Sequence, residues 1–511
     1  MKQLSRWIPV SLIVIVTLVL MWVWETHSDD RQRKLLVTAT CLLALGTLLG
    51  LWFVLLGPFR RRTRLFICVV LVSCGAVAAS LVRVRGVTGD LVPILGWRHS
   101  PVTDTGFQPF PTTHRSVEIE TDSSSHSPYP QFLGPNRNAT VHGAKLIRDW
   151  EKQKPRQVWR REVGPGWSAF AVDGDVAITQ EQHGDTEMVT CYSLLTGELY
   201  WKHGDPARYD NVLGGVGPRA TPTISQDRVY TVGATGVLNC LDRTTGRRFW
   251  SHDVIAENSA KPYVWGMSGS PLVLDEVVVV SVGGENGRSL VAYRKADGEL
   301  AWQGGNAGGG YSSPSLATLA TVPQILVLHT AAVIAHDPTN GKVLWTADWP
   351  GQNAKAAQPV TLSGNRVMIS SGYGNGCAVL QIERKNDGLT ARQLWKNLSL
   401  KAKFANFVAR GDFVYGLDDG ILVCVEVQTG KRRWKSGRYG HGQLILADDL
   451  LLIMAESGEV VLVEATPDEH RELTRFTAFQ EKTWNSPALA TPYLLVRNDR
   501  EAACFELPVL P

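Results

Sequence analysis

An eleven-residue pattern that returns five times is the feature that most constrains the fold of this 511-residue chain. Every copy has a glycine at its seventh position and ends in tryptophan. The copies are CYSLLTGELYW, CLDRTTGRRFW, AYRKADGELAW, AHDPTNGKVLW and CVEVQTGKRRW, which end at Trp201, Trp250, Trp302, Trp345 and Trp434. A repeat of this kind indicates an architecture in which one supersecondary unit occurs many times. The number of repeats therefore determines the architecture of this part of the chain.

Three weaker copies extend the repeat to eight markers. RKNDGLTARQLW ends at Trp395, KPRQVW ends at Trp159, and EATPDEHRELTRF places Phe476 at the tryptophan position. The markers are 39 to 52 residues apart, a period typical of four-stranded propeller blades. Runs such as RVYTVGA, EVVVVSVG and LLLIMAE, separated by Gly, Asp and Asn turns, predict strands. We therefore expect an all-β fold, an eight-bladed β-propeller.

The two ends of the repeat region complement each other. Residues 157–162 supply an outer strand without inner partners, and SPALATPYLLVRNDREAACFELP supplies inner strands without an outer one. A circular array leaves two open sheet edges unless both chain ends share one blade. Joining the ends closes the ring, so a chain truncated before Ala502 is not expected to fold stably.

The glycine of each copy is expected in a tight turn between two strands. Glycine adopts a positive φ without steric cost, which such turns require. Replacing any of these glycines by valine should destabilise its hairpin, while the aromatic ring that follows can fill the wedge between neighbouring sheets. The glycines are Gly197, Gly246, Gly298, Gly341 and Gly430.

In these repeats the sequence resembles the pyrroloquinoline-quinone-repeat (PQQ-repeat) propellers, whose outer strands carry the pattern A-x-D-x-x-T-G-x-x-x-W. The resemblance covers residues 129–507, and the opening PYPQFLGPNRNAT is similar to the start of many envelope-attached bacterial members. It implies tryptophans that dock blade to blade. It also implies one of two functions, because the family contains quinoprotein dehydrogenases and non-catalytic envelope propellers such as the outer-membrane assembly factor BamB.

Three uncharged apolar runs precede the repeats, at residues 8–24, 35–56 and 65–82. Each is long enough to cross a bilayer as a helix. The first run has no cleavage-site pattern and two more runs follow it, which favours retention in the membrane over a removable signal peptide. A lipoprotein-like box at Cys74 is disfavoured because the apolar run continues past it.

The charges flanking these runs predict their orientation. Lys2 and Arg6 lie before the first run, and Arg60, Arg61, Arg62 and Arg64 crowd the second connection. Because Lys and Arg tend to remain cytoplasmic, we expect a cytoplasmic amino terminus and a propeller outside the bacterial inner membrane, in the periplasm or another extracytoplasmic space. Arg31, Arg33 and Lys34 in the first connection weaken this contrast.

Composition divides the chain into a membrane domain at 1–86, a Pro/Ser/Thr-rich linker at 87–128 and a propeller at 129–511. The net charge of +4 is spread thinly, which excludes a typical nucleic-acid-binding protein. We expect the bilayer and other membrane or envelope proteins as partners.

The sequence contains no recognisable catalytic or metal motif. It has no adjacent Cys-Cys pair of the kind that the resemblance to dehydrogenases implies beside the quinone, and no C-x-x-C-H, H-E-x-x-H, G-x-S-x-G or P-loop pattern. The DGD and DDG clusters, with Asp173, Asp175, Asp418 and Asp419, lack calcium-loop spacing and are interpreted as turns. Cys191, Cys240 and Cys424 fall on different blades, so disulfides among them are not expected.

A ligand site, if one exists, is expected where the innermost strands begin. The segments after each tryptophan strand should ring one mouth of the axial channel and supply an aromatic and polar set of the kind that lines pockets. The alternative interpretation is that these side chains only fix loops and cap the core. The candidates are Trp167, Arg219, Trp265, Tyr311, Lys403, Asn406, His441, Trp484 and Asn485.

Two hypotheses of function follow. The favoured one is a membrane-anchored, non-catalytic propeller that binds envelope proteins or assists envelope assembly, with no catalytic residue and no metal. The alternative is a membrane-bound quinoprotein oxidoreductase acting on an alcohol or a sugar, for which the resemblance implies pyrroloquinoline quinone with calcium.

Overall fold

A computed structural model describes residues 7–26, 31–98, 126–351, 353–385 and 388–511. The chain divides into two compact units, Met1–Val102 and Thr103–Pro511, and each is considered by itself. Residues 99–125 of the expected linker lie outside the described residues.

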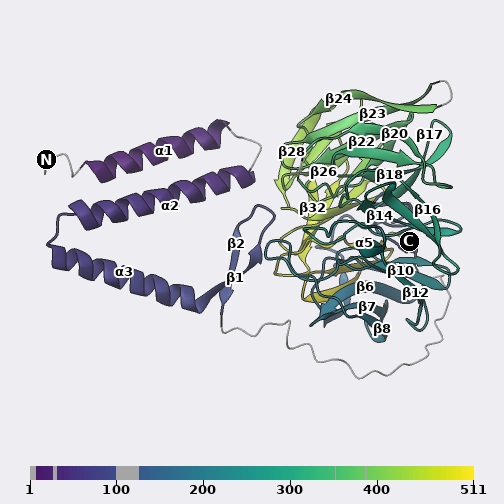
Figure 1. Ribbon diagram of the computed structural model, residues 1–511, viewed down its shortest axis with the longest axis horizontal. Coiled ribbons are helices and arrows are strands. Elements are labelled where there is room, and N and C mark those ends of the chain that lie inside the picture. The colour runs from purple at the N-terminus through teal and green to yellow at the C-terminus, as the bar shows by residue number, and fades with distance from the viewer. Residues whose placement is uncertain (1–6, 27–30, 99–125, 352, 386–387) are drawn as a thin grey trace. The chain divides into compact units, whose positions relative to one another are not determined.

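The first unit contains three long apolar helices and a short hairpin (Figure 1). The helices are α1 (Ile8–Thr26), α2 (Arg31–Leu56) and α3 (Arg61–Leu81), each long and apolar enough to cross a membrane. A hairpin is formed by β1 (Val82–Val87) and β2 (Pro93–Trp97), and β2 lies in the segment 87–128 that composition indicated as linker. Apolar and charged residues alternate in the VRVR run of β1, which favours a strand, but the neighbouring Pro- and Ser-rich segment obscured this signal.

The second unit contains eight blades, numbered here in chain order, so the expected eight-bladed propeller is confirmed (Figure 1). Blade 1 contains β5 (Ala171–Asp173), β6 (Val176–His183), β7 (Thr186–Ser193) and β8 (Leu199–Asp205). Blade 2 contains β9 (Thr223–Ser225), β10 (Arg228–Val232), β11 (Val237–Asp242) and β12 (Arg248–Asp253), followed by the short helix α5 (Val254–Glu257). Blade 3 contains β13 (Leu272–Val273), β14 (Val277–Gly284), β15 (Arg288–Arg294) and β16 (Leu300–Gly304).

The next three blades repeat this antiparallel order from the axis outward. Blade 4 contains β17 (Ser315–Leu319), β18 (Val322–Leu328), β19 (Ala332–His336) and β20 (Val343–Asp348). Blade 5 contains β21 (Val360–Leu362), β22 (Arg366–Ser371), β23 (Gly376–Lys385) and β24 (Gly388–Asn397). Blade 6 contains β25 (Phe407–Arg410), β26 (Phe413–Asp418), β27 (Ile421–Glu426) and β28 (Arg432–Arg438).

Blades 7 and 8 each include a strand from the start of the propeller sequence. Blade 7 contains β29 (Gln443–Ala447), β30 (Leu450–Met454), β31 (Glu459–Glu464) and β32 (Glu472–Thr477), with β3 (Thr140–Val141) paired parallel to β29. Blade 8 contains β33 (Ala488–Ala490), β34 (Tyr493–Arg497) and β35 (Glu501–Glu506), completed by β4 (Arg156–Glu162) as its outer strand. The expected closure by both chain ends is therefore confirmed.

Most of the repeat tryptophans join one blade to the next. The indole N–H of Trp201 in blade 1 donates to the carbonyl of Arg243 in blade 2 at 2.8 Å, and Trp159 reaches Leu194 across the closing seam at 2.7 Å. Phe476, at the atypical marker, packs on Phe505 of blade 8 with 4.8 Å between ring centroids. Trp345 differs because its N–H bonds to Gln324 within its own blade.

Residues 126–150 form a strap across the axis of the ring. Tyr129 pairs with Val172 of blade 1, and Arg137 donates to the carbonyls of Ser270 and Pro271 of blade 3 at 3.0 Å. Only two residues later, the carbonyl of Ala139 accepts from Leu446 N of blade 7 at 2.8 Å. Blades 3 and 7 face one another in a ring of eight, so the strap crosses the axis at residues 137–139.

Candidate functional site

One face of the propeller is formed by two sets of loops, which we call the loop face. The connections that enter the inner strands lie beside the turns between the second and third strands of each blade. Glu456, in the turn between β30 and β31, shows this arrangement: its carboxylate accepts from the backbone N–H of His441 at 3.0 Å and from the indole of Trp484 at 2.8 Å. The loop face carries all nine residues expected at the channel mouth.

Asn406 and Asn485 belong to a ring of hydrogen bonds around the axis, which we call the girdle. At the start of six of the eight inner strands a polar side chain bonds the backbone of an adjacent blade. Asn406 Oδ1 accepts from Gln358 N at 2.9 Å, and Asn485 Nδ2 donates to Ser168 O at 2.8 Å. The other members are Thr221, Ser270, Ser313 and Gln443.

Trp167, His441 and Trp484 form one aromatic cluster on blades 7, 8 and 1. The rings of Trp167 and Trp484 lie 5.0 Å apart, and Phe404 lies 5.1 Å from Trp484 and 5.2 Å from His441. Lys482 Nζ sits over Trp484 at 4.0 Å and over Trp167 at 4.9 Å. Burial lowers the pKa of Lys482, although the attraction of nearby carboxylates opposes the shift. The faces of the Trp167 and Trp484 rings therefore already make cation–π contacts with the ammonium group of Lys482.

Arg219 organises a second region on blades 2 to 4. Its guanidinium donates to the carbonyls of Gly214 at 3.1 Å and Gly215 at 2.8 Å, and it stacks on Tyr209 at 4.2 Å. Burial lowers the pKa of Arg219 to about 10. The guanidinium therefore fixes the loop between β8 and β9.

Trp265 and Tyr311 extend this second region toward blade 4. The backbone N–H of Trp265 donates to the hydroxyl of Tyr311 at 3.4 Å, and Tyr311 N donates to the carbonyl of Lys355 at 3.1 Å. Burial raises the pKa of the Tyr311 hydroxyl, so this acceptor stays neutral at ordinary pH. These contacts link blades 3, 4 and 5 at the loop face.

Lys403 belongs to a buried group of charges on blade 6. Its Nζ lies 3.5 Å from Asp419 Oδ1, and Lys401 Nζ lies 2.6 Å from Asp418 Oδ1. Lys435 Nζ approaches the other oxygen of Asp418 at 2.5 Å. The DDG carboxylates lie at a turn, as expected, but no pattern in the sequence indicated that lysines from a neighbouring loop would pair with them.

The nine candidates therefore do not converge on one point. The structure distributes them among the girdle, the aromatic cluster, the Arg219 region and the blade 6 charges, and most of their polar atoms hold loops or join blades. This geometry agrees with the alternative that the sequence left open, although it does not test binding by the aromatic cluster.

Comparison with known proteins gives the family. The family model described as outer membrane protein assembly factor BamB (PQQ_2) matches residues 142–260 and 185–436, which together span more than half of the 511 residues. The chain belongs to this family.

A curated BamB of Xanthomonas campestris is 26% identical over 139 residues, which cover 27% of this chain and 32% of that protein. The match thus spans about a third of the relative's length. The crystal structure of BamB from Moraxella catarrhalis aligns with a TM-score of 0.50 at 15% identity, covering 69% of this chain and 100% of that one. Quinohemoprotein alcohol dehydrogenase from Comamonas testosteroni aligns with a TM-score of 0.54 at 11% identity, covering 74% and 80%. At these identities the structures establish a shared fold only.

The resemblance to quinoprotein dehydrogenases implies a calcium ion beside the quinone. The carboxylates on the loop face do not fit such a calcium site. Asp418 and Asp419 are engaged by lysines, and Glu456 accepts from a backbone amide and an indole. Calcium requires six to eight oxygen ligands gathered around one point. Among the described residues, no group of three or more His, Cys, Asp or Glu side chains is placed to hold a metal ion.

Some residues of the site were missed by sequence reasoning. Phe404, Glu456 and Lys482 complete the aromatic cluster, yet only Phe404 stands beside a predicted residue in the sequence. Glu187, on blade 1, is buried with Oε1 accepting from Ala234 N at 3.1 Å, and burial raises the pKa of its carboxyl to about 7. The sequence signal for this residue was a glutamate next to the apolar residues of a predicted strand, in the run TEMVTCYS.

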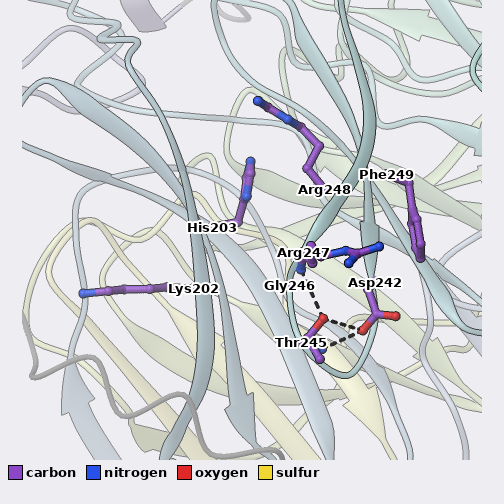
Figure 2. A pocket seen from close by; sticks show the side chains of 8 residues that line it. All are labelled: Lys202, His203, Asp242, Thr245, Gly246, Arg247, Arg248 and Phe249. Atoms are coloured by element: carbon purple, nitrogen blue, oxygen red, sulfur yellow. Dashed lines mark hydrogen bonds between the residues drawn. The ribbon is translucent and has the colours of Figure 1, made fainter.

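A separate groove of about 630 Å³ lies between the outer strands of blades 1 and 2 (Figure 2). It is lined by His203 of β8 and by the β11–β12 hairpin, including Arg247, Arg248 and Phe249. Arg248 Nη1 and His203 Nε2 lie 3.2 and 3.6 Å from the same oxygen of Asp205. The carboxylate of Asp242 accepts hydrogen bonds from the backbone N–H and the hydroxyl of Thr245 within the hairpin (Figure 2). Asp205 and Asp242 are therefore both engaged by neighbouring protein groups.

Proposed function

We propose that this BamB-family chain is a membrane-anchored, non-catalytic propeller that binds other envelope proteins through its loop face. The observation that carries the proposal is an exposed apolar surface on two neighbouring loops, which we call the apolar tips. They consist of Val212 and Leu213, with exposed fractions of 82% and 41%, and Val264, with an exposed fraction of 68%. Apolar side chains displayed together on a soluble surface are typical of protein-binding sites.

The backbone beneath the apolar tips is fixed by hydrogen bonds. The Tyr209 hydroxyl and Asn211 Nδ2 both donate to the carbonyl of Val264, the latter at 3.2 Å. Asn211 Oδ1 accepts from Leu213 N at 3.0 Å, and Trp167 Nε1 donates to Gly214 O at 2.7 Å. A preorganised surface loses less conformational entropy on association, so this rigidity favours binding.

The membrane part of the proposal rests on α1, α2 and α3. We propose that they cross the bacterial inner membrane with the amino terminus in the cytoplasm, which leaves the propeller outside. The arginines at the start of α3 and Arg60 just before it support this orientation. Membrane-impermeant labelling of single cysteines tests it: a cysteine at Val212 should react in intact spheroplasts and one at Arg62 only after lysis, whereas the reverse pattern contradicts it.

Site-specific crosslinking tests the binding surface. A photoreactive amino acid at Val212 or Val264 in the full chain should give a reproducible adduct with an envelope protein in cells. The control places the same group at Leu394, on the outer strand β24, with an exposed fraction of 39%. Val264→Asp should abolish the adduct formed from Val212 without lowering the melting temperature, whereas equal adducts from all three positions contradict the proposal.

Titration with pyrroloquinoline quinone and calcium tests the oxidoreductase alternative, which the shared fold with the dehydrogenase brings forward. We expect no saturable shift in melting temperature of the full chain. A ligand that binds only the native state at a hundred times its Kd would add about 2.7 kcal/mol, so binding would be plainly visible. A saturable shift together with quinone reduction by an alcohol or a sugar would replace our proposal with the enzymatic one.

A further inference from the structure

Arg137 of the strap is a buried cation on the propeller axis without an acidic partner. Its side chain has an exposed fraction of 5%. Its guanidinium donates to three neutral oxygens, those of Gln131, Ser270 and Pro271, each at 3.0 Å. Among the described residues no carboxylate lies within 4.0 Å of it. A buried charge is costly unless a counter-charge accompanies it.

Two other arginines of the propeller, the buried Arg497 and the partly exposed Arg219, differ in this respect. Arg497, which is 1% exposed, has Glu181 as an attractive neighbour, and Arg219 has Glu187. Burial lowers the pKa of Arg137 to about 9, and no acidic group opposes that shift. The positive charge on the axis is therefore not neutralised by the described part of the chain.

Orphaned polar atoms lie on residues of the girdle that surrounds the axis. Ser270, whose carbonyl Arg137 contacts, and Gln358 occupy the same girdle position, each immediately before a proline. Both side-chain atoms of Gln358, Asn485 Oδ1 and Arg137 Nε are buried without a hydrogen-bond partner in the described residues. Buried polar groups without protein partners indicate an additional occupant, either water or an ion.

We propose that a small monovalent anion binds on the propeller axis, between the guanidinium of Arg137 and the side-chain amide of Gln358. Both groups offer N–H donors, and an anion between them supplies the missing counter-charge. A single charge suits the site, because a divalent anion would leave one negative charge buried there. Halide ions and the carboxylate of a small organic acid share this chemistry.

The site connects the strap to the ring. Arg137 lies in the segment that crosses the axis, and Gln358 lies on blade 5, so a bound anion joins parts of the propeller that are far apart in sequence. A ligand that binds only the native state raises the free energy of unfolding by RT ln(1 + [L]/Kd). The stability of the propeller should therefore depend on the kind of anion present, beyond ionic strength.

Thermal melting of the full chain in detergent tests the proposal. Chloride, bromide, formate and sulfate each replace a bulky sulfonate at constant ionic strength. We expect a saturable rise in melting temperature of a few degrees with chloride or bromide, and none with sulfate. A rise with formate alone would assign the site to carboxylates, whereas identical melting in all five salts overturns the proposal.

Variants separate this site from general salt effects. Arg137→Met should abolish the anion-dependent rise, and Arg219→Met, which removes a partly exposed arginine with an acidic neighbour, should retain it. If Arg137→Met does not fold, Gln358→Met provides the test, because it keeps the strap and should raise several-fold the bromide concentration at half-maximal shift. A rise unchanged in Gln358→Met overturns the proposal.

Crystals grown in bromide give a direct readout. We expect an anomalous scattering peak within hydrogen-bond distance of the Arg137 guanidinium. Density for water alone at that position, with no anomalous signal, contradicts the assignment whatever the melting data show.

Discussion

A β-carbon placed on Gly246 would lie 2.3 Å from Cε3 of Trp201, the tryptophan of the preceding blade. Gly246 also has a φ of +70°. The same relation joins Gly197 to Trp159 at 2.7 Å and Gly430 to Trp395 at 2.7 Å. The glycine of the repeat therefore has two roles. It adopts the positive φ of its own turn, and its lack of a side chain leaves room for the indole ring of the preceding blade.

Gly246→Ala should lower the free energy of unfolding by about 2–4 kcal/mol, because it adds a left-handed backbone cost and a steric clash. The matched control is Gly184→Ala, at a φ of +57° where nothing lies within 4 Å of the added carbon. It should cost only about 1–2 kcal/mol. Denaturant unfolding of both variants measures the difference, and equal losses would show that the indole contact contributes nothing.

Deleting the chain from Ala502 onward should prevent stable folding. The deletion removes most of β35, which bonds both β34 and the outer strand β4, and so opens the ring at blade 8. We expect aggregation or rapid proteolysis in place of a monomer with a cooperative melt. Deletion of Pro511 alone, which is exposed, should leave melting unchanged. A monomeric, cooperatively melting truncated protein would contradict the role assigned to the closure.

Acidification should destabilise the propeller through His329. Burial lowers the pKa of this histidine from 6.5 to about 3, and the neighbouring His336 adds to the shift. Below pH 6.5 the unfolded chain therefore binds a proton that the native state does not. Stability should fall by about 1.4 kcal/mol per pH unit for each such histidine between pH 6 and 4.

The variant His329→Phe should reduce this pH dependence when unfolding is followed across the same range. His142→Gln, at an exposed position of the strap, is the control and should retain the slope. An undiminished slope in His329→Phe would assign the acid sensitivity to other groups.

Glu187 should have the opposite dependence on pH. The pKa of its carboxyl is raised by burial from 4.5 to about 7, so the native state retains a proton that the unfolded chain releases. The free energy of unfolding therefore falls as pH rises between those values. Glu187→Gln should stabilise the protein at pH 8 by about 1–3 kcal/mol and have little effect at pH 5. Glu198→Gln, at an exposed turn, should be neutral at both values, and a neutral Glu187→Gln at pH 8 would contradict the assignment.

The candidate site was predictable only in part from sequence. The repeat placed Asn406 and Asn485 at the starts of inner strands, and the structure has both side chains in hydrogen bonds between blades there. It could not show that their amides bond backbone groups of adjacent blades. Glu456 was missed because it reaches Trp484 from a different turn. Lys482 lies only two residues before Trp484 in the same loop, but its sequence position does not show that its Nζ lies over that ring.

The number of blades, the closing strand and the three apolar helices could all be predicted from the amino-acid sequence. Each of these depends on periodicity or on the length of an apolar run, and both are local properties of the chain. Tertiary structure alone decided the partners of Gly246, Lys403 and Arg137. Gly246 contacts the preceding blade, Lys403 contacts a different turn, and Arg137 contacts blade 3 from the strap. These segments meet only when the ring closes, and no local sequence pattern encodes the distances between them.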